Sequence, residues 1–463
     1  MDEEADRVSL GGTMKRFKAY EPDQCYLLPP SMKEWLPSDH LVYFLSDVVD
    51  SLDLSAVYAG YDDGVGQPPY HPRMMVKVWL YGYCRGIRPS RKLERALHED
   101  VGFRVLSGNQ QPDHWTLSEF RRRHLDALGN LFLQTVKLAQ QAGLVKLGQV
   151  AIDGTKVKAY ASKHAAMSYG RMVKEEQRLR GEIARYFEES EAADREEESK
   201  HPDELPEELR TAGKRLAAIE TAKRALEEEA KQRARYEQGE RRKKAQEEGR
   251  PFHPTKNPDD TSPKDKAQRN FTDPESRIMK NADQAFIQAY NAQVAVDVDS
   301  QIIVAADLSN QAADGPHLLP LVRDVMRNCD EKPSEVLADA GYFSEANVTA
   351  LEREAISVLI PPGRIRHRAW RRESAQIVPP PGEDAAAAER MRYRLDQPAG
   401  RERYRKRECS VEPVYGQIKE GRGLRQFQLR GLAKVKALWL FDCAAHNLLK
   451  LYGGRACPQP APA

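Results

Sequence analysis

The 463-residue sequence has few cysteines, and their arrangement indicates neither a metal site nor a disulfide framework. The six cysteines are scattered without a C-x-x-C pair, which argues against a zinc knuckle and fits a reducing compartment. No apolar run approaches the roughly 18 residues of a membrane span, and no basic-then-apolar leader is evident. The phosphate-binding pattern G-x-x-x-x-G-K-[ST] is also missing. We therefore expect a soluble, cytoplasmic protein that contacts no membrane and uses no nucleotide cofactor.

Charge is nearly balanced over the whole chain but not along it. The formal net charge is +2, yet residues 361–436 hold 19 Lys and Arg against nine Asp and Glu. This stretch carries about +10 and the remainder about −8. A local excess of positive charge is typical of a surface that binds a polyanion, although ordinary proteins also have basic stretches.

Residues 26–145 have the pattern of helices separated by loops rich in Gly, Pro, Asn and Asp. One helix is expected between Pro72 and Gly86, and others within residues 91–100 and 116–142. The basic side chains expected on the helix surfaces are Arg91, Lys92, Arg95, Arg121, Arg122 and Arg123. Helix, tight turn and helix with a basic face predict a DNA-binding module, and a helical bundle with a solvated basic face fits equally well.

Residues 165–250 change character, being dominated by Glu, Lys, Arg and Ala. Apolar residues keep heptad spacing on two arms, namely Met172, Leu179 and Tyr186 on the first and Leu209, Ala212, Leu216, Ile219, Leu226 and Ala230 on the second. This pattern predicts a helical hairpin that turns at residues 201–206. The hairpin is an intramolecular brace, a dimer contact or a solvated spacer, and the residues do not decide among these.

From Gln288 onward the pattern changes to a period of two with β-branched residues, which predicts two strands around an Asp299-Ser300 turn. A helix near residues 315–328, a strand ending at Asp339, a helix capped by Ser344 and a strand at residues 357–362 follow. With an earlier strand ending at Asp153, the series predicts a mixed α/β sheet with helices against it. The helical hairpin interrupts this series after the first strand.

Three carboxylates are candidates for chemistry. Asp153 and Asp339 each end an apolar strand and are followed within two positions by Gly, which also fits an ordinary turn. In "CSVEPVYGQIKEGRG", Ser410 is expected to cap a helix that has Glu412 in its first turn. Glu412 is either a surface ion-pair partner or a metal ligand.

Several short blocks in a fixed order resemble bacterial insertion-sequence transposases with a DDE catalytic core on an RNase H-like fold. The blocks are "AIDGTKVKAYAS", "NFTDPESRIM", "QAYNAQVAVD", "LADAGYFS", "VEPVYGQIKEGRGLRQFQLRG" and "AHNLLKL". The block that begins "HPRMMVKVWLYGYCRG" is similar to the N-terminal domain of the same proteins. The resemblance covers most of residues 20–452.

The resemblance implies that the catalytic residues and metal ligands are Asp153, Asp339 and Glu412. They would hold two Mg²⁺ ions, with Mn²⁺ as a substitute, and Asp153 would bridge both. DNA-binding roles would fall to Tyr404, Arg407, Lys419, Arg422 and Arg425. Four residues rather than the three of the family pattern separate Arg407 from Glu412. On a continuous helix the extra residue rotates Arg407 about 100° away from the face of Glu412, so a bend or cap at residues 410–413 is expected to absorb it.

The implied activity is cleavage of insertion-element ends, followed by transfer of the 3′ hydroxyl into target DNA. The implied partners are double-stranded DNA, as terminal inverted repeats and as target, and a second copy of the chain in the DNA complex, at the bacterial nucleoid. The expected regions are 1–145, helical and DNA-binding; 146–164 and 276–452, the RNase H-like core; 165–250, the hairpin; 251–275, a linker; and 453–463, a tail.

Two alternatives remain open at this point. One is a catalytically silent DNA-binding protein derived from such an enzyme, and the other is a coiled-coil scaffold that uses the hairpin. Asp297, Asp307 and Asp314 are further acids near strand ends, and among these Asp307 is expected to be best placed for a metal. Trp370 is a candidate for stacking on an extruded base, whereas His446 is expected to be packed rather than a ligand.

Overall fold

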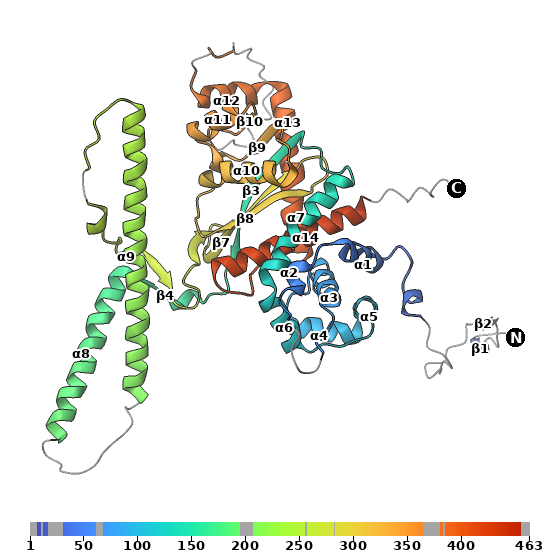
Figure 1. The fold of residues 1–463 in the computed structure, drawn as a ribbon, viewed down its shortest axis with the longest axis horizontal. Helices are drawn as coiled ribbons and strands as arrows, with labels where there is room; N and C mark the ends of the chain where they lie inside the picture. The colour runs from blue at the N-terminus through green and yellow to red at the C-terminus, as the bar shows by residue number, and fades with distance from the viewer. Residues whose placement is uncertain are drawn as a thin grey trace.

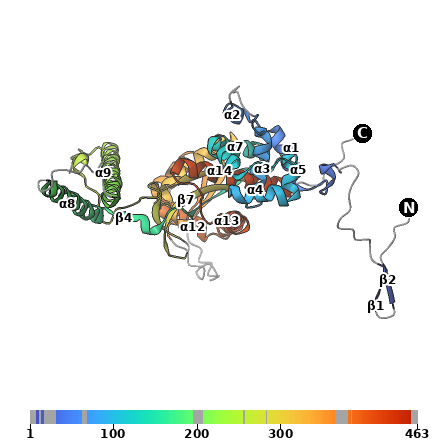
Figure 2. The ribbon, with the colours of Figure 1, turned by 90° about the horizontal axis from the view of Figure 1, so that it is seen from below.

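The computed structural model describes residues 7–10, 13–16, 31–61, 68–194, 207–254, 257–281, 283–363, 380–382 and 385–454. Figure 1 shows a central sheet with helices, a bundle of helices built from the first third of the chain, and a long helical arm. The view in Figure 2 places the arm and the N-terminal helices at opposite ends of the sheet. Trp370, the hairpin tip and the C-terminal tail lie outside the described residues.

The N-terminal part folds as helices, preceded by a short hairpin of strands β1 (Arg7–Leu10) and β2 (Thr13–Arg16). The helices are α1 (Leu41–Ser51), α2 (Ser55–Tyr58), α3 (Pro72–Cys84), α4 (Ser90–Glu99), α5 (Val101–Ser107), α6 (His114–Arg123) and α7 (Leu125–Gln141). Their core includes Phe441 and Leu448 from the C-terminal helix α14 (Leu432–Gly453). The expected surface position of Arg121 is wrong. Its guanidinium is buried over the Trp79 ring and donates to the Arg88 carbonyl (2.9 Å).

The central sheet has six strands in the order β10-β9-β3-β7-β6, with β8 also paired to β7. The strands are β3 (Gln149–Lys158), β6 (Arg277–Lys280), β7 (Phe286–Asp297), β8 (Ile303–Ser309), β9 (Glu335–Ala338) and β10 (Ser357–Leu359). β3, β9 and β10 are parallel, while β7 is antiparallel to β3, β6 and β8. This mixed sheet with a helical N-terminal part is the predicted fold class, an RNase H-like core with added helices.

The expected end of the first strand at Asp153 is wrong. β3 continues to Lys158 because β7 supplies an antiparallel partner for every residue from Val150 to Lys158. Its parallel pairing with β9 covers only Gln149 to Ile152. Asp153 therefore lies just beyond the segment of β3 that pairs with β9 but within the segment that pairs with β7.

Five helices of the described chain pack around the sheet. They are α10 (Leu318–Cys329), α11 (Glu345–Arg353), α12 (Ala387–Asp396) and α13 (Pro398–Gly416), with α14 last. Of these, the sequence predicts α10 and α11 but not α12. The side chain of Ser344 caps α11, as expected, by accepting from the Asn347 amide (3.1 Å). α13 contacts β3, β7 and β9, whereas α14 contacts β8 and α7.

The expected helix start at Ser410 is wrong, because Ser410 is a buried residue in the interior of α13. Pro413 also lies inside this helix and has no N–H to offer the Cys409 carbonyl. The side-chain amide of Gln301 donates to that carbonyl instead (3.0 Å). A π-helical turn, Gln417–Gly421, follows α13 directly.

The predicted hairpin is present as α8 (Tyr169–Asp194) and α9 (Glu207–Glu247), which form the arm. Met172 and Leu179 of α8 pack with Ile219, Ala222 and Leu226 of α9. β4 (Ala166–Ser168) pairs with β5 (Gln268–Asn270) where the chain enters and leaves the arm. Within the described residues, no helix is long and apolar enough to cross a membrane.

Candidate active site

Asp153 and Asp339 lie side by side at one edge of the sheet. In the parallel pairing of β3 with β9, Ile152 is the register partner of Ala338, and each aspartate is the next residue. The Asp339 carboxylate accepts from the Gly341 amide (2.9 Å) and so caps the short helical turn Ala340–Tyr342. Carboxyl ends of adjacent parallel strands are where ligand groups gather in α/β sheets.

The Asp153 carboxylate is partly buried and lies among other charged groups. Its Oδ1 accepts from the Gly154 amide (2.9 Å), and its Oδ2 lies 3.3 Å from Nη2 of Arg407. Burial raises the pKa of Asp153, the Arg407 guanidinium lowers it and the negative charge of Asp339 raises it, and the net result is a pKa of about 6. A carboxyl group with this pKa binds and releases protons close to neutral pH.

Gly154 follows Asp153 because a side chain has no room there, not because the chain turns. A Cβ at this position would lie 2.3 Å from Nε2 of Gln293 and 2.8 Å from Oδ1 of Asp314. These two side chains are hydrogen-bonded to each other (2.8 Å). The Asp-Gly pair therefore reflects a close approach of polar groups to the strand.

Asp314 is the centre of a polar network that links the two aspartate segments. Its Oδ1 accepts from Lys156 of β3 (2.9 Å) and from Asn291 and Gln293 of β7 (2.8 Å each). The Tyr342 hydroxyl, three residues after Asp339 in the chain, donates to Oε1 of Gln293. β3 and the turn after β9 are thus held together through buried amides rather than only through the sheet.

Helix α13 holds the aspartates from one face of the sheet. Tyr404 is buried, its hydroxyl donates to the Ala338 carbonyl (3.3 Å), and burial raises its pKa to about 12. The Tyr415 hydroxyl lies 2.8 Å from the Asp153 carbonyl oxygen and 3.1 Å from that of Ala292. The side chains of Tyr404 and Arg407 therefore contact other residues of the protein beside the two aspartates.

Glu412 is exposed on α13 and forms no ion pair within the described part of the chain. The helix is continuous through this region, so Arg407 and Glu412 point in directions about 140° apart. Arg407 and Tyr415 both contact Asp153. Glu412 lies between these two residues along α13, although its side chain points in another direction than that of Arg407. No three His, Cys, Asp or Glu side chains among the described residues lie close enough to hold a metal ion together.

The basic residues expected to hold DNA occupy different environments. Lys419 lies in the π-helical turn and donates to Oγ1 of Thr155 (3.0 Å), two residues after Asp153. Arg425 is exposed and pairs with Glu420. Arg422 is buried, and burial lowers its pKa, so the expectation that it contacts phosphate does not fit its position.

Arg422 is enclosed where the N-terminal helices meet α14. Arg88 donates through Nη1 to the Arg422 carbonyl (2.5 Å) and through Nε to both carboxylate oxygens of Asp442 (3.1 and 3.2 Å). Nε and Nη2 of Arg422 have no hydrogen-bond partner among the described residues. The sequence gives no local sign of this burial, because Asp442 and Arg88 are distant in the chain.

The remaining acids and histidine can now be placed. Asp307, expected to be the best placed extra acid, pairs with Lys436 (2.5 Å) instead. Asp297 is buried and accepts from the Lys146 and Leu147 amides (3.1 and 3.0 Å), a structural role. Asp314 is the extra acid at the site. His446 is packed, as expected, with Nε2 lying 3.0 Å from the Gln301 carbonyl oxygen.

Sequence reasoning missed the network around Asp314, although one signal was present. Asn291 and Gln293 lie two apart in a strand made largely of apolar residues, and both are completely buried. Buried amides two residues apart share one face of a strand and require partners there. They mark the face that the site uses.

Comparison with known proteins agrees with this architecture. Residues 251–448 match the family model described as Transposase DDE domain, and residues 30–123 match Transposase domain (DUF772). The chain therefore carries a transposase DDE domain and, on its N-terminal side, a separate transposase domain, and together these support an insertion-sequence DDE transposase. No curated protein and no solved structure gives a significant match. The DDE match contains Asp339 and Glu412, while Asp153 lies outside the match and is brought beside Asp339 by the pairing of β3 with β9.

Proposed function

We propose that the protein cleaves the ends of an insertion element and transfers the resulting 3′ hydroxyl into target DNA, with Asp153, Asp339 and Glu412 as catalytic carboxylates. The observation that carries the proposal is the adjacency of Asp153 and Asp339 at the carboxyl ends of two parallel strands. The family assignment supports transposition as the overall activity. The proposal keeps the division of the chain expected from the sequence, with a helical DNA-binding part at 1–145 and a catalytic core at 146–164 and 276–452.

The donor chemistry at the site fits two Mg²⁺ ions, with Mn²⁺ as a substitute. Asp153 and Asp339 bring carboxylates to one edge of the sheet, Glu412 would complete the ligand set, and hard divalent ions prefer such oxygen ligands. Positive charge there would offset the repulsion that Asp153 and Asp339 exert on each other. When bound, the ions supply activation of the attacking oxygen and stabilisation of the leaving oxygen.

The residues of the chain would hold the reacting groups in place. Arg407 fixes one oxygen of Asp153 and the Gly154 amide fixes the other, so this carboxylate has one orientation. Lys419, held against Thr155, places an ammonium group beside the strand that carries Asp153, where it would contact a phosphate near the scissile bond. Glu412 is proposed as the third carboxylate because it lies in α13 between Arg407 and Tyr415, which both contact Asp153.

In the first step, water attacks phosphorus at the element end, and the 3′ oxygen leaves as a hydroxyl. In the second step, this hydroxyl attacks a phosphodiester of target DNA, and the displaced oxygen takes up the proton. One phosphodiester is exchanged for another in the second step, so no nucleotide cofactor is required. The exposed cations Arg425 and Arg430 would bind DNA backbone, and a homodimer would bring the two ends together.

The test is cleavage of a duplex bearing the element end in Mg²⁺, with three variants, Asp153→Asn, Asp339→Asn and Glu412→Gln. We expect cleavage to fall below detection in each, while DNA affinity stays within about threefold. A matched control is Asp299→Asn, an exposed aspartate in the turn between β7 and β8. Full activity in any one of the three variants would refute the assignment of that carboxylate, and a wild-type protein that binds ends without cutting would be a silent DNA-binding protein.

A further inference from the structure

The arm carries a groove on the side that faces the sheet. We define the arm groove as two adjoining hollows that share Glu229 and Arg233 of α9. The first, of about 510 Å³, lies between α9 and residues 261–267. The second lies between α9 and the loop of residues 310–313.

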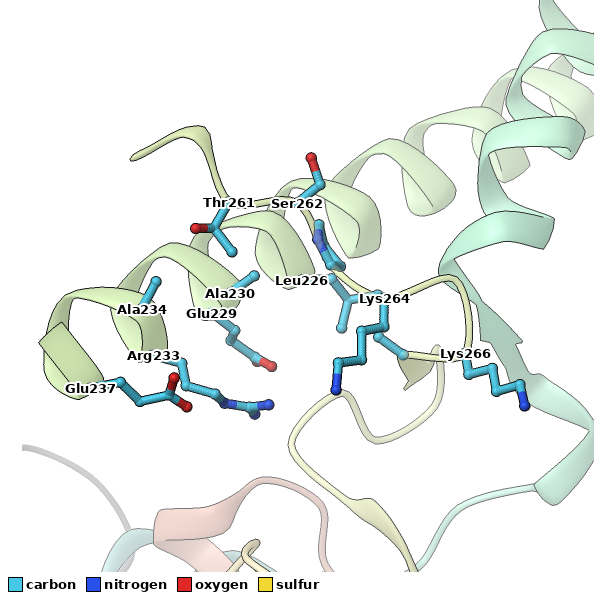
Figure 3. Close-up of a pocket in the computed structure, with 12 residues that line it drawn as sticks. Leu226, Glu229, Ala230, Arg233, Ala234, Glu237, Thr261, Ser262, Lys264 and Lys266 are labelled. Carbon is cyan, nitrogen blue, oxygen red and sulfur yellow. The ribbon is translucent and has the colours of Figure 1, made fainter. Parts of the chain in front are cut away.

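Three cations and two carboxylates line the first hollow. Arg233, Lys264 and Lys266 are exposed and form no ion pair within the part of the chain that the structure describes. Figure 3 shows Arg233 and Lys264 extending toward the same open space, with the Glu237 carboxylate beside Arg233 and Lys266 directed away from the other two cations. Asp265, between the two lysines, has its side chain near Gly170 at the start of α8.

The acidic residue shared by the two hollows is already neutralised. Glu229 accepts from Arg269 (2.6 Å) and from Arg277 (2.7 Å), so it does not offset Arg233. Glu237 is the other carboxylate among the residues that line the first hollow. The groove therefore has a surplus of positive charge, while apolar side chains such as Leu226 and Pro263 also line it.

The groove leads toward the candidate active site. Its second hollow reaches residues 310–313, directly before Asp314. Asp314 is hydrogen-bonded to Lys156, three residues after Asp153 in β3. A chain of negative charges lying along Arg233 would therefore be directed to the edge that carries the aspartates.

We propose that the arm groove binds the sugar-phosphate backbone of duplex DNA next to the segment held at the active site. The inference rests on the proposed function and assigns the arm a role in substrate binding. Arg233 borders both hollows, and Lys264 and Lys266 line the first, so the cations extend beyond one hollow, which fits an extended polyanion better than a single small anion. Backbone contacts of this kind add affinity and salt dependence but little sequence preference.

The test compares Arg233→Glu/Lys264→Glu with a control of equal charge change, Lys174→Glu/Lys214→Glu. The control lysines are exposed on α8 and α9 and line neither hollow. Binding of a fluorescent 30-base-pair duplex is measured by anisotropy at several salt concentrations. We expect the groove variant to lose about tenfold or more in affinity at low salt and about two units of the slope of log K against log salt concentration.

The control should bind within about threefold of the unmodified protein with an unchanged slope. Equal losses in the two variants, or no loss in the groove variant, would overturn the proposal. Stronger competition by polyglutamate than by unlabelled duplex would also overturn it, since the groove would then fit an acidic peptide. Circular dichroism verifies that both variants fold.

All binding is measured in EDTA on an Asp153→Asn background, so that the result does not depend on cleavage. If the unmodified protein fails to cleave but the groove variant still loses DNA affinity, the proposed function fails and the arm groove stands. If cleavage proceeds and the groove variant binds DNA like the control, the proposed function stands and the proposal for the arm groove fails.

Discussion

Asp153 is the residue at which function and stability should conflict most. Its pKa of about 6 exceeds the ordinary value of 3.8 because the folded protein buries the carboxylate beside Asp339. A raised pKa means that the folded state prefers the protonated form. The stability contributed by this preference is complete below about pH 4 and is lost as the pH rises through 6.

At pH 7.5 without metal, ionised Asp153 should therefore destabilise the fold by about 3 kcal/mol, at about 1.4 kcal/mol per pKa unit. Asp153→Asn removes the charge while its amide oxygen can still accept from Gly154. Because Arg407 loses its anionic partner, we expect a net gain of about 1–3 kcal/mol in the free energy of unfolding.

The assay is urea unfolding in EDTA at pH 4, 6 and 7.5, with Asp299→Asn as the surface control. The gain from Asp153→Asn should be near zero at pH 4 and largest at pH 7.5. Adding Mg²⁺ should then stabilise the unmodified protein more than the variant, since a ligand stabilises the state that binds it. A variant that is no more stable than the unmodified protein at pH 7.5, or a gain that does not change with pH, would refute the reasoning.

Three further predictions follow from the same geometry. Arg407→Gln should shift the acidic limb of the cleavage pH profile to higher pH, because the guanidinium lowers the pKa of Asp153. An acidic limb at unchanged pH in single-turnover rates would contradict this. Gly154→Ala should destabilise the protein by about 1–3 kcal/mol, because its Cβ would meet Gln293 at 2.3 Å; urea unfolding would show it. Burial lowers the pKa of His446 to about 3, so its neutral form contributes stability above about pH 6.5 that is lost as the pH falls toward 3. Unfolding between pH 6.5 and 4 should accordingly be less pH-dependent in His446→Gln.

Much of the fold follows from patterns local in the chain. The period-two segments, the capping serine at 344 and the heptads of the arm each predict an element that is present. The adjacency of Asp153 and Asp339 does not follow from local patterns; the family resemblance implies a shared site, and the parallel pairing of β3 with β9 places the two residues at one edge of the sheet.

The features that the sequence predicts wrongly depend on partners far away in the chain. β3 continues past Asp153 because β7 pairs with it, and α13 continues past Pro413 because Gln301 satisfies the freed carbonyl. Arg422 lies in the basic stretch, yet Arg88 and the N-terminal helices enclose its segment. Composition indicates that a region is basic, but burial by distant segments decides which cations reach solvent.

The placement of the arm explains how a large insertion coexists with an intact site. Ala166 of β4 and Asn270 of β5 are register partners, so the chain leaves and re-enters the body at one point. β3 therefore finds both its neighbours, β7 and β9, in the chain that follows the arm. Closing this long loop costs little more entropy than closing a shorter one, because the cost grows only with the logarithm of length. The sheet thus holds Asp153 beside Asp339 whatever the length of the arm, which leaves the arm surface able to acquire contacts with DNA without disturbing the aspartates.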